Sequence, residues 1–171
     1  EVIIALPETQ VFTRTIKFPP LTDQEIVSAV KWEAEQYIPI PISEAIVQHS
    51  IIERRENTVP PEVAVLLVAA PRNIVEVYVK AATLAGLNVV AVETELTALA
   101  RALSPEGQTV LLVDFGARST DIAVVKNGQL SFTRTIPTAG EAFTRAVAQT
   151  LGVELSQAEE YKRAYGMSGS Q

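Results

Sequence analysis

Short apolar runs that stop at proline or at polar turns predict several β-strands in the first half of the chain. Residues 2–6 and 11–18 are rich in Val, Ile and Phe, and proline follows each run, so both predict strands. Residues 46–53 and 63–70 predict two more strands, which a polar loop with prolines joins. Residues 87–92 predict a further strand directly after a glycine.

Apolar residues spaced three and four positions apart predict helices between these strands. Residues 22–25 read Thr-Asp-Gln-Glu, which is the pattern of a capping box, and the spacing after them predicts a helix to about residue 38. A second helix is predicted between Pro71 and Gly86, and a third over residues 94–103. The turn at 104–107 is the best candidate for a domain boundary.

Two aromatic residues of the first predicted helix occupy different faces. Tyr37 falls on the apolar face, so we expect it to pack in the core. Trp32 falls off that face, and it either packs on a neighbouring strand or belongs to a binding surface.

The last third of the chain predicts three strands followed by two helices. Residues 110–125 read as strand, turn and strand, and Asn127-Gly128 predicts a two-residue hairpin into a strand at 130–136. Gly140 precedes a predicted helix that ends at Gly152, and a second capping box at 156–159 predicts a helix that stops at Gly166. The order of elements predicts a small α+β unit followed by half of an α/β nucleotide-binding domain.

Composition excludes several classes of function. The net charge of −6 without a basic run argues against nucleic acid and against an anionic membrane surface as partners. With no cysteine and one histidine, disulfide scaffolds, zinc fingers and cysteine nucleophiles are excluded, and a cytosolic location is compatible. The longest apolar run, residues 63–70, is too short to span a bilayer as a helix.

The turn at residues 114–121 carries the candidate chemistry. It gathers backbone N–H groups, two hydroxyls and two carboxylates at one sheet edge, which suits phosphates and a hydrated metal ion. The alternative is that Asp and Gly only form a turn.

Three motifs in order resemble the actin-like ATPase superfamily. Residues 114–121, Asp-Phe-Gly-Ala-Arg-Ser-Thr-Asp, resemble its second phosphate loop, and Gly140 sits where that superfamily has a glycine turn. Ala158-Glu159-x-x-Lys162 with Gly166 resembles its nucleoside-contacting helix. The resemblance implies an α/β chain with an inserted α+β subdomain, which is a partial actin-like ATPase (ribonuclease H-like) fold.

Within that superfamily, residues 33–41 are very similar to the Glu-x-Glu-x-Tyr-Ile-Pro-x-Pro signature of the PilM family of type IV pilus assembly proteins. By this resemblance, residues 1–12 end the first actin-like lobe and 13–86 form the inserted subdomain (1C, SHS2-like). Residues 87–107 then supply a return strand and a crossover helix, and 108–171 begin the second lobe (2A). The resemblance also implies that the chain is the middle of a longer protein whose other phosphate loop and adenine-binding segment lie elsewhere.

The resemblance implies a cytoplasmic ATP-binding scaffold on the inner-membrane platform that assembles type IV pili for twitching motility. It would bind the cytoplasmic N-terminal peptide of PilN and contact other platform proteins, with self-association possible, and it would lie at the membrane through partners without inserting. ATP and Mg²⁺ would bind the intact protein, with at most weak hydrolysis, and this part alone would be inactive. The alternatives are an FtsA-like division filament protein and a sugar- or acetate-kinase-type enzyme.

The superfamily roles, carried onto this sequence, give a set of expected site residues. Asp114 would be catalytic and would hold the metal through a water molecule near the phosphates, while Gly116 allows close backbone approach. Ser119 and Thr120 would offer hydroxyl and N–H groups to phosphate. The full cofactor-binding set is Gly116, Ala117, Arg118, Ser119, Thr120, Asp121, Gly140, Glu159 and Lys162.

Four of these residues have competing interpretations. Arg118 either adds charge to a phosphate or crowds the loop, and Asp121 either orients the loop or caps the turn. Glu159 and Lys162 would contact the ribose and base, but Glu159 also falls at the third position of a predicted capping box, and Lys162 is equally readable as a solvated charge. Gly140 supplies a required backbone conformation in every interpretation.

Overall fold

The computed structural model describes residues 1–166 of the 171-residue chain. Two compact units result, an N-terminal unit of Glu1–Leu112 with Ala123–Thr133, and a C-terminal unit of Val113–Ile122 with the chain from Arg134 onward. The strands and helices follow the predicted order. They are β1 Val2–Leu6, β2 Phe12–Phe18, α1 Asp23–Tyr37, β3 Ala45–Arg55, β4 Glu62–Pro71, α2 Arg72–Leu84, β5 Val89–Thr94, α3 Glu95–Leu103, β6 Thr109–Phe115, β7 Thr120–Lys126, β8 Gln129–Ile136, α4 Gly140–Leu151 and α5 Leu155–Tyr165.

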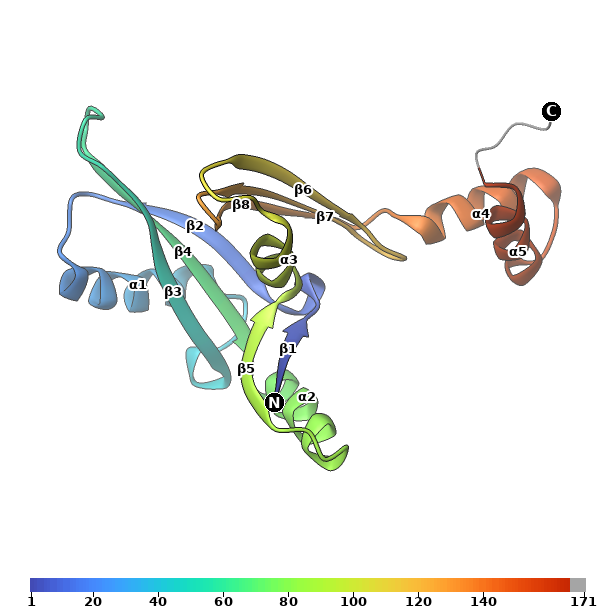
Figure 1. The fold of residues 1–171 in the computed structure, drawn as a ribbon, viewed down its shortest axis with the longest axis horizontal. Helices are drawn as coiled ribbons and strands as arrows, with labels where there is room; N and C mark the ends of the chain where they lie inside the picture. Colours follow the sequence, from blue (N-terminus) through green and yellow to red (C-terminus); the bar gives the residue numbers. More distant parts are fainter. Residues whose placement is uncertain (167–171) are drawn as a thin grey trace. The chain divides into compact units, whose positions relative to one another are not determined.

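The sheet formed by β2, β4 and β3 is antiparallel and carries α1 on one face (Figure 1). Thr22 caps α1 as predicted, because its hydroxyl accepts the Glu25 amide while the Glu25 carboxylate accepts the Thr22 amide at 2.8 Å. Beneath the helix lies a core of fully or nearly buried apolar side chains. It is formed by Ile16, Phe18, Ile26, Val30, Ala34, Ile38, Val63, Val65, Leu67 and Ala69.

The opposite face of β4 contributes to a second core of the N-terminal unit. Leu66 packs there with Leu96 and Ala100 of α3 and with Ala123, Val125 and Leu130 of β7 and β8. Successive side chains of a strand point to opposite faces, so alternate residues of β4 serve the two cores. This explains why β4 reads as a continuous apolar run in the sequence instead of alternating with polar residues.

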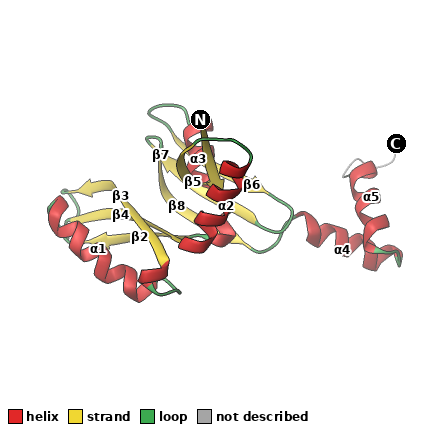
Figure 2. Ribbon diagram, turned by 90° about the horizontal axis from the view of Figure 1, so that it is seen from below, coloured by secondary structure: helices red, strands yellow, loops and turns green. Residues whose placement is uncertain are grey.

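Strands β1 and β5 form a separate two-stranded parallel sheet, although a long stretch of chain lies between them. The register aligns Leu6 with Thr94, so both strands end at the same edge. Helices α2 and α3 both contact β5 (Figure 2). This pairing brings the start of the chain next to the segment that follows the α2 helix.

The predicted burial of Tyr37 and the predicted capping box at 156–159 are both wrong. Tyr37 is not a core residue, because 38% of its surface is exposed and the Arg14 guanidinium lies 3.9 Å above its ring. The capping box at 156–159 does not form, since α5 begins at Leu155 after Glu154. The Glu159 carboxylate contacts α4 instead. Trp32 is 63% exposed, so it lies on the surface.

Short 3₁₀ turns at Glu8–Gln10 and Ile42–Glu44 were not expected from the sequence, because three residues are too few to show a periodicity. Strand β5 begins at Val89, two positions later than the apolar pattern indicated. None of the helices in residues 1–166 is both long and apolar enough to cross a membrane. The four-part subdomain division stays a prediction, because compactness alone does not identify subdomains.

Candidate functional site

The loop between β6 and β7 closes tightly on itself. The Gly116 amide donates to the Ser119 carbonyl at 3.0 Å, and a Cβ atom on Gly116 would meet that same carbonyl at 3.1 Å. A side chain at residue 116 would therefore push the turn open. Within residues 1–166, the N–H groups of Ala117 and Arg118 have no intramolecular hydrogen bond. Adjacent unpaired amides at a turn are suited to bind an anion.

Asp121 holds the loop through hydroxyl groups. Its carboxylate is buried and accepts hydrogen bonds from Ser119 Oγ at 2.9 Å and from Thr135 Oγ1 of β8. Thr120 is also buried, and its hydroxyl donates to the Thr138 carbonyl at 2.7 Å. This geometry favours the interpretation in which Asp121 orients the loop. Because both loop hydroxyls donate their protons inside the protein, the backbone amides are the better candidates for contact with phosphate.

Asp114 lies at the end of β6 with a half-buried side chain. In the described part of the chain its carboxylate forms no hydrogen bond or ion pair. No cluster of three or more His, Cys, Asp or Glu residues forms a direct metal cage among residues 1–166. An unpaired carboxylate beside free amides fits a hydrated Mg²⁺ held through water, since this ion commonly keeps several of its waters.

Gly140 is the junction between the loop and helix α4. Its amide donates to the Gly116 carbonyl at 3.1 Å, and the next amide, from Glu141, donates to the Ala117 carbonyl at 2.8 Å. A Cβ atom on Gly140 would lie 3.3 Å from the Gly116 carbonyl oxygen and 3.5 Å from Lys162 Nζ. The first amides of α4 therefore hold the loop. Gly140 does not have a positive φ, so the predicted need for a special backbone conformation is wrong, and residue 140 must be small because the two parts meet closely.

Helices α4 and α5 are joined by a polar network around Thr144, which is buried. Lys162 Nζ donates to the Gly140 carbonyl at 3.1 Å and to Thr144 Oγ1 at 2.9 Å, and it lies 2.6 Å from Glu159 Oε2. Thr144 Oγ1 donates to the same Glu159 oxygen, while Arg163 Nε donates to Glu159 Oε1 at 2.8 Å.

The charge state of Glu159 follows from these neighbours. Hydrogen bonds from Lys162, Thr144 and Arg163 lower the pKa of Glu159 to about 2. The carboxylate is thus ionised, and it can only accept hydrogen bonds at neutral pH. Lys162 is not a simple solvated charge, because it connects three groups of the protein.

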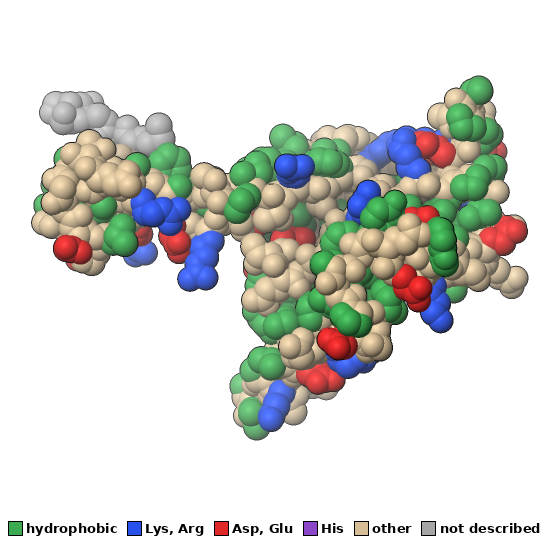
Figure 3. Space-filling model, turned by 180° about the vertical axis from the view of Figure 1, so that it is seen from behind, with side chains coloured by type: hydrophobic (Ala, Val, Ile, Leu, Met, Phe, Trp, Pro, Cys, Tyr) green, Lys and Arg blue, Asp and Glu red, His purple; other side chains and the backbone are tan. Residues whose placement is uncertain are grey.

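Arg118 turns away from the loop. Its side chain is 86% exposed, and its Nε donates to Glu141 Oε1 at 3.2 Å, so it does not crowd the turn. Arg145 lies 3.7 Å from the other Glu141 oxygen. Figure 3 shows acidic and basic side chains next to one another on the part of the chain that holds α4 and α5. Arg118 is therefore exposed and paired with Glu141, outside the turn itself.

A cavity of about 470 Å³ lies beside this network in the C-terminal unit. It brings Ala117, Glu159 and Lys162 together, whereas Asp114, Arg118 and Ser119 are outside its lining. The remaining lining residues are Glu141, Thr144, Arg145, Leu155, Ser156 and Arg163. Sequence reasoning missed Thr144, whose only signal was its position one helical turn after Gly140.

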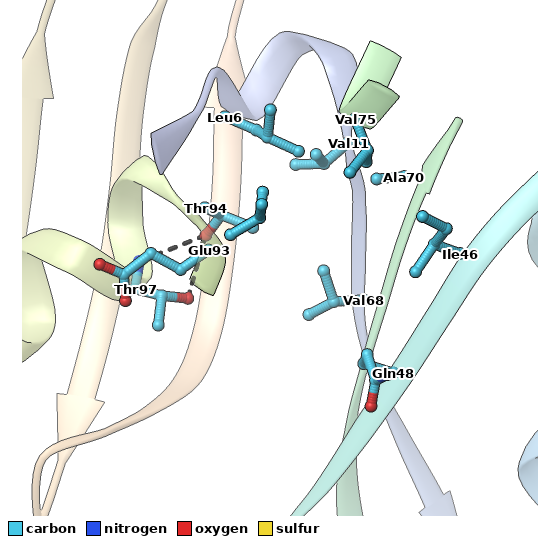
Figure 4. Close-up of a pocket in the computed structure, with 11 residues that line it drawn as sticks. Leu6, Val11, Ile46, Gln48, Val68, Ala70, Val75, Glu93, Thr94 and Thr97 are labelled. Atoms are coloured by element: carbon cyan, nitrogen blue, oxygen red, sulfur yellow. Dashed lines mark hydrogen bonds between the residues drawn. The ribbon is translucent and has the colours of Figure 1, made fainter. Parts of the chain in front are cut away.

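A smaller, mostly apolar pocket of about 250 Å³ lies in the N-terminal unit (Figure 4). Thr94 and Thr97 lie on one side of it and Ile46 and Gln48 on the other, and Leu6, Val68 and Val75 add apolar surface. Its volume is below the range of about 300–1,000 Å³ that is usual for small-molecule sites. It is therefore better matched to one or two apolar side chains of a partner than to a nucleotide.

Comparisons with known proteins show the family of the chain. Residues 1–170 match the family described as type IV pilus assembly protein PilM. The chain is 30% identical over 149 residues to the cell division protein FtsA of Bacillus subtilis strain 168, a match that covers 78% of this chain and 34% of FtsA.

Two solved structures are similar over most of the chain. The PilM–PilN type IV pilus biogenesis complex matches with a TM-score of 0.77 and 31% identity, over 96% of this chain and 50% of that one. The cytoplasmic domain of EpsL, an inner-membrane component of the type II secretion system of Vibrio cholerae, matches with a TM-score of 0.58 over 89% of this chain and 54% of that one. Its identity of 10% makes this a likeness of fold alone.

The expected fold class is confirmed: the chain is a mixed α/β protein that forms part of the actin-like ATPase fold. It spans about a third of the length of the division protein and half of the solved PilM chain.

Proposed function

The chain belongs to the PilM family of type IV pilus assembly proteins, and on that premise we propose that it is the central part of an ATP-binding, cytoplasmic scaffold that binds the N-terminal peptide of a PilN-type membrane protein. The observation that carries the nucleotide half of this proposal is the junction at Gly140, where the β6–β7 loop meets helices α4 and α5. A loop suited to phosphate and a carboxylate suited to ribose hydroxyls are thereby held in one compact unit.

The residues divide into two groups by what they offer a nucleotide. The free amides of Ala117 and Arg118, with the exposed Arg118 side chain, suit the phosphates. Asp114 would hold Mg²⁺ through water, and a bound Mg²⁺ would neutralise phosphate charge. Glu159, which is ionised and accepts hydrogen bonds, suits the hydroxyl groups of a ribose.

The apolar pocket of the N-terminal unit is our candidate for the peptide. Leu6, Ile46 and Val68 line it with apolar surface, and its volume of about 250 Å³ suits an apolar peptide side chain. The similar PilM chain is in a complex with PilN, which supports a PilN-type partner here. The exposed Gln48 side chain can pair with the peptide backbone at the wall of the pocket, whereas the Thr94 hydroxyl is buried and caps α3.

The proposal is tested on the complete protein that contains this chain. A fluorescent peptide from the PilN-type partner is titrated with and without Mg-ATP, and an Ile46→Lys variant is compared with Val59→Lys, whose residue is fully exposed. We expect tight binding that Ile46→Lys abolishes and Val59→Lys preserves. A change of affinity with Mg-ATP would demonstrate coupling of the two sites. Absence of peptide binding in every condition would refute the scaffold proposal.

A division protein is the second candidate, because FtsA of Bacillus subtilis is 30% identical over 149 residues. An FtsA-like protein would form filaments on lipid surfaces. Sedimentation of the complete protein with vesicles of mixed anionic lipid distinguishes the two functions, since the pilus proposal expects no sedimentation unless the membrane partner is present.

A further inference from the structure

Thr144 is the most heavily engaged buried polar side chain of the C-terminal unit, and no expectation from the sequence included it. Its hydroxyl lies 2.9 Å from Lys162 Nζ and 3.2 Å from the Gly140 carbonyl, and its closest contact is Glu159 Oε2 at 2.5 Å. A hydroxyl has one proton. The shorter contact and the negative charge of Glu159 direct that proton to the carboxylate.

The ammonium group of Lys162 is fully paired inside the protein. An ammonium group has three protons, and Lys162 has three partners inside the protein: the Gly140 carbonyl, Thr144 Oγ1 and Glu159 Oε2. All three ammonium protons of Lys162 are therefore directed at groups of the protein. Lys162 has to give up one of these bonds before it can donate to a ligand.

The Glu159 carboxylate, in contrast to Lys162, keeps a free position for a ligand. A carboxylate accepts at about four positions. Thr144 and Lys162 occupy Oε2, and Arg163 occupies one position on Oε1. One acceptor position on Oε1 is left, and the side chain is 33% exposed at a cavity of about 470 Å³. Glu159 can thus accept a hydrogen bond from a ligand hydroxyl without breaking any bond it already makes.

We infer that Thr144 is a positioning residue, which with Lys162 fixes the Glu159 carboxylate so that its free acceptor position binds the 2′-hydroxyl of a ribose, the group that deoxyribose lacks. The inference rests on the proposed nucleotide function. In this arrangement Lys162 holds Gly140, and through it the phosphate loop, in position. Glu159 alone binds the sugar. A hydroxyl group is the partner because an ionised carboxylate needs a donor.

The test compares binding of Mg-ATP and Mg-dATP to the complete protein by calorimetry. We expect the wild-type protein to prefer Mg-ATP, Thr144→Val to bind Mg-ATP about tenfold more weakly and to lose the preference, and Thr144→Ser to keep it. Thr150→Val, the same change at an exposed position of α4, should alter neither quantity. A merely structural role of Thr144 would weaken both nucleotides equally and leave their ratio unchanged.

The outcomes separate the inference from the proposed function. A wild-type protein that binds neither nucleotide overturns both. A wild-type protein that binds both equally, or a Thr144→Val variant that keeps the preference, overturns the inference and leaves nucleotide binding in place. If Thr144→Val fails to fold, as judged by circular dichroism, Thr144→Ala supplies the same comparison, because it also removes the hydroxyl.

Discussion

The Gly140 amide donates a hydrogen bond of 3.1 Å to the Gly116 carbonyl, so the first residue of α4 is bound directly to the loop that follows β6. Lys162 contacts the carbonyl of the same Gly140 from α5. The loop is therefore hydrogen-bonded to α4 through Gly140 and Glu141, and Gly140 also connects it to α5.

Replacing Gly140 by Ala should weaken nucleotide binding two- to tenfold while the protein stays folded. The new Cβ would lie 3.3 Å from the Gly116 carbonyl oxygen, so the loop has to shift by a few tenths of an ångström. Alanine is the better helix former by about 1 kcal/mol, which offsets the crowding. Calorimetric titration with Mg-ATP and a thermal melt provide the two measurements.

The matched change at Gly128 should give the reverse pattern. Gly128 has a φ of +75° in the β7–β8 turn, a conformation that costs a residue with a side chain about 1–2 kcal/mol. Gly128→Ala should lower the melting temperature and leave nucleotide affinity unchanged. If Gly140→Ala binds Mg-ATP like the wild type, contact at Gly140 does not control the loop.

Replacing Asp114 by Ala should weaken Mg-ATP binding about ten- to hundredfold, as is typical when an outer-sphere partner of a metal is removed. Affinity for nucleotide in the presence of EDTA should change little, because the carboxylate acts through the ion. Calorimetry with and without Mg²⁺ measures both, with the exposed Glu106→Ala as the control. An unchanged Mg-ATP affinity would remove the metal role of Asp114.

Acid titration should reveal the ion pairs of Glu159. Its pKa falls from the ordinary value of 4.5 to about 2 on folding, so the carboxylate stabilises the folded state above pH 4.5. That contribution is lost as the pH falls from about 4.5 through 2. Glu159→Gln should therefore lower the free energy of unfolding at pH 7 and flatten its decline in this acid range. Glu160→Gln, an exposed neighbour, should behave like the wild type in urea unfolding at each pH.

Removing the cap of α1 should lower the free energy of unfolding by about 1 kcal/mol in a Thr22→Ala variant. The loss reflects the hydrogen bond from the Glu25 amide to the Thr22 hydroxyl, whereas the backbone amide of residue 22 can still donate to the Glu25 carboxylate. Urea unfolding monitored at the single tryptophan, Trp32 of the same helix, measures it. Ser28→Ala, in the exposed middle of α1, should be neutral or slightly stabilising. Equal stability of wild type and Thr22→Ala would contradict the role of the cap.

Local signals in the sequence predicted the elements where a side chain acts on its own neighbours. The Thr22 capping box formed, and Asn127 and Gly128 have φ values of 52° and 75°, as a two-residue hairpin turn requires. The similarity of residues 33–41 to the PilM signature also led to the correct family. These features depend on residues close together in the chain, so a single sequence contains them.

Contacts between elements could not be predicted from such local patterns. Glu159 reaches Thr144 of another helix instead of capping its own, and that choice depends on how α4 and α5 pack. Tyr37 lies under Arg14 of β2 rather than in the core, because the strand beside it supplies a cation. A helical period shows which face is apolar, but it does not show which partner the neighbouring element offers.

Strand β4 gives its odd-numbered side chains to the core beneath α1 and Leu66 to the core with α3. Neither core can open without disturbing the strand that lines the other. The N-terminal unit should consequently behave as one cooperative foldon in which the β4 amides exchange their hydrogens last, because they become accessible only when the whole unit unfolds. Because β4 is shared, the two small cores should unfold together as one unit.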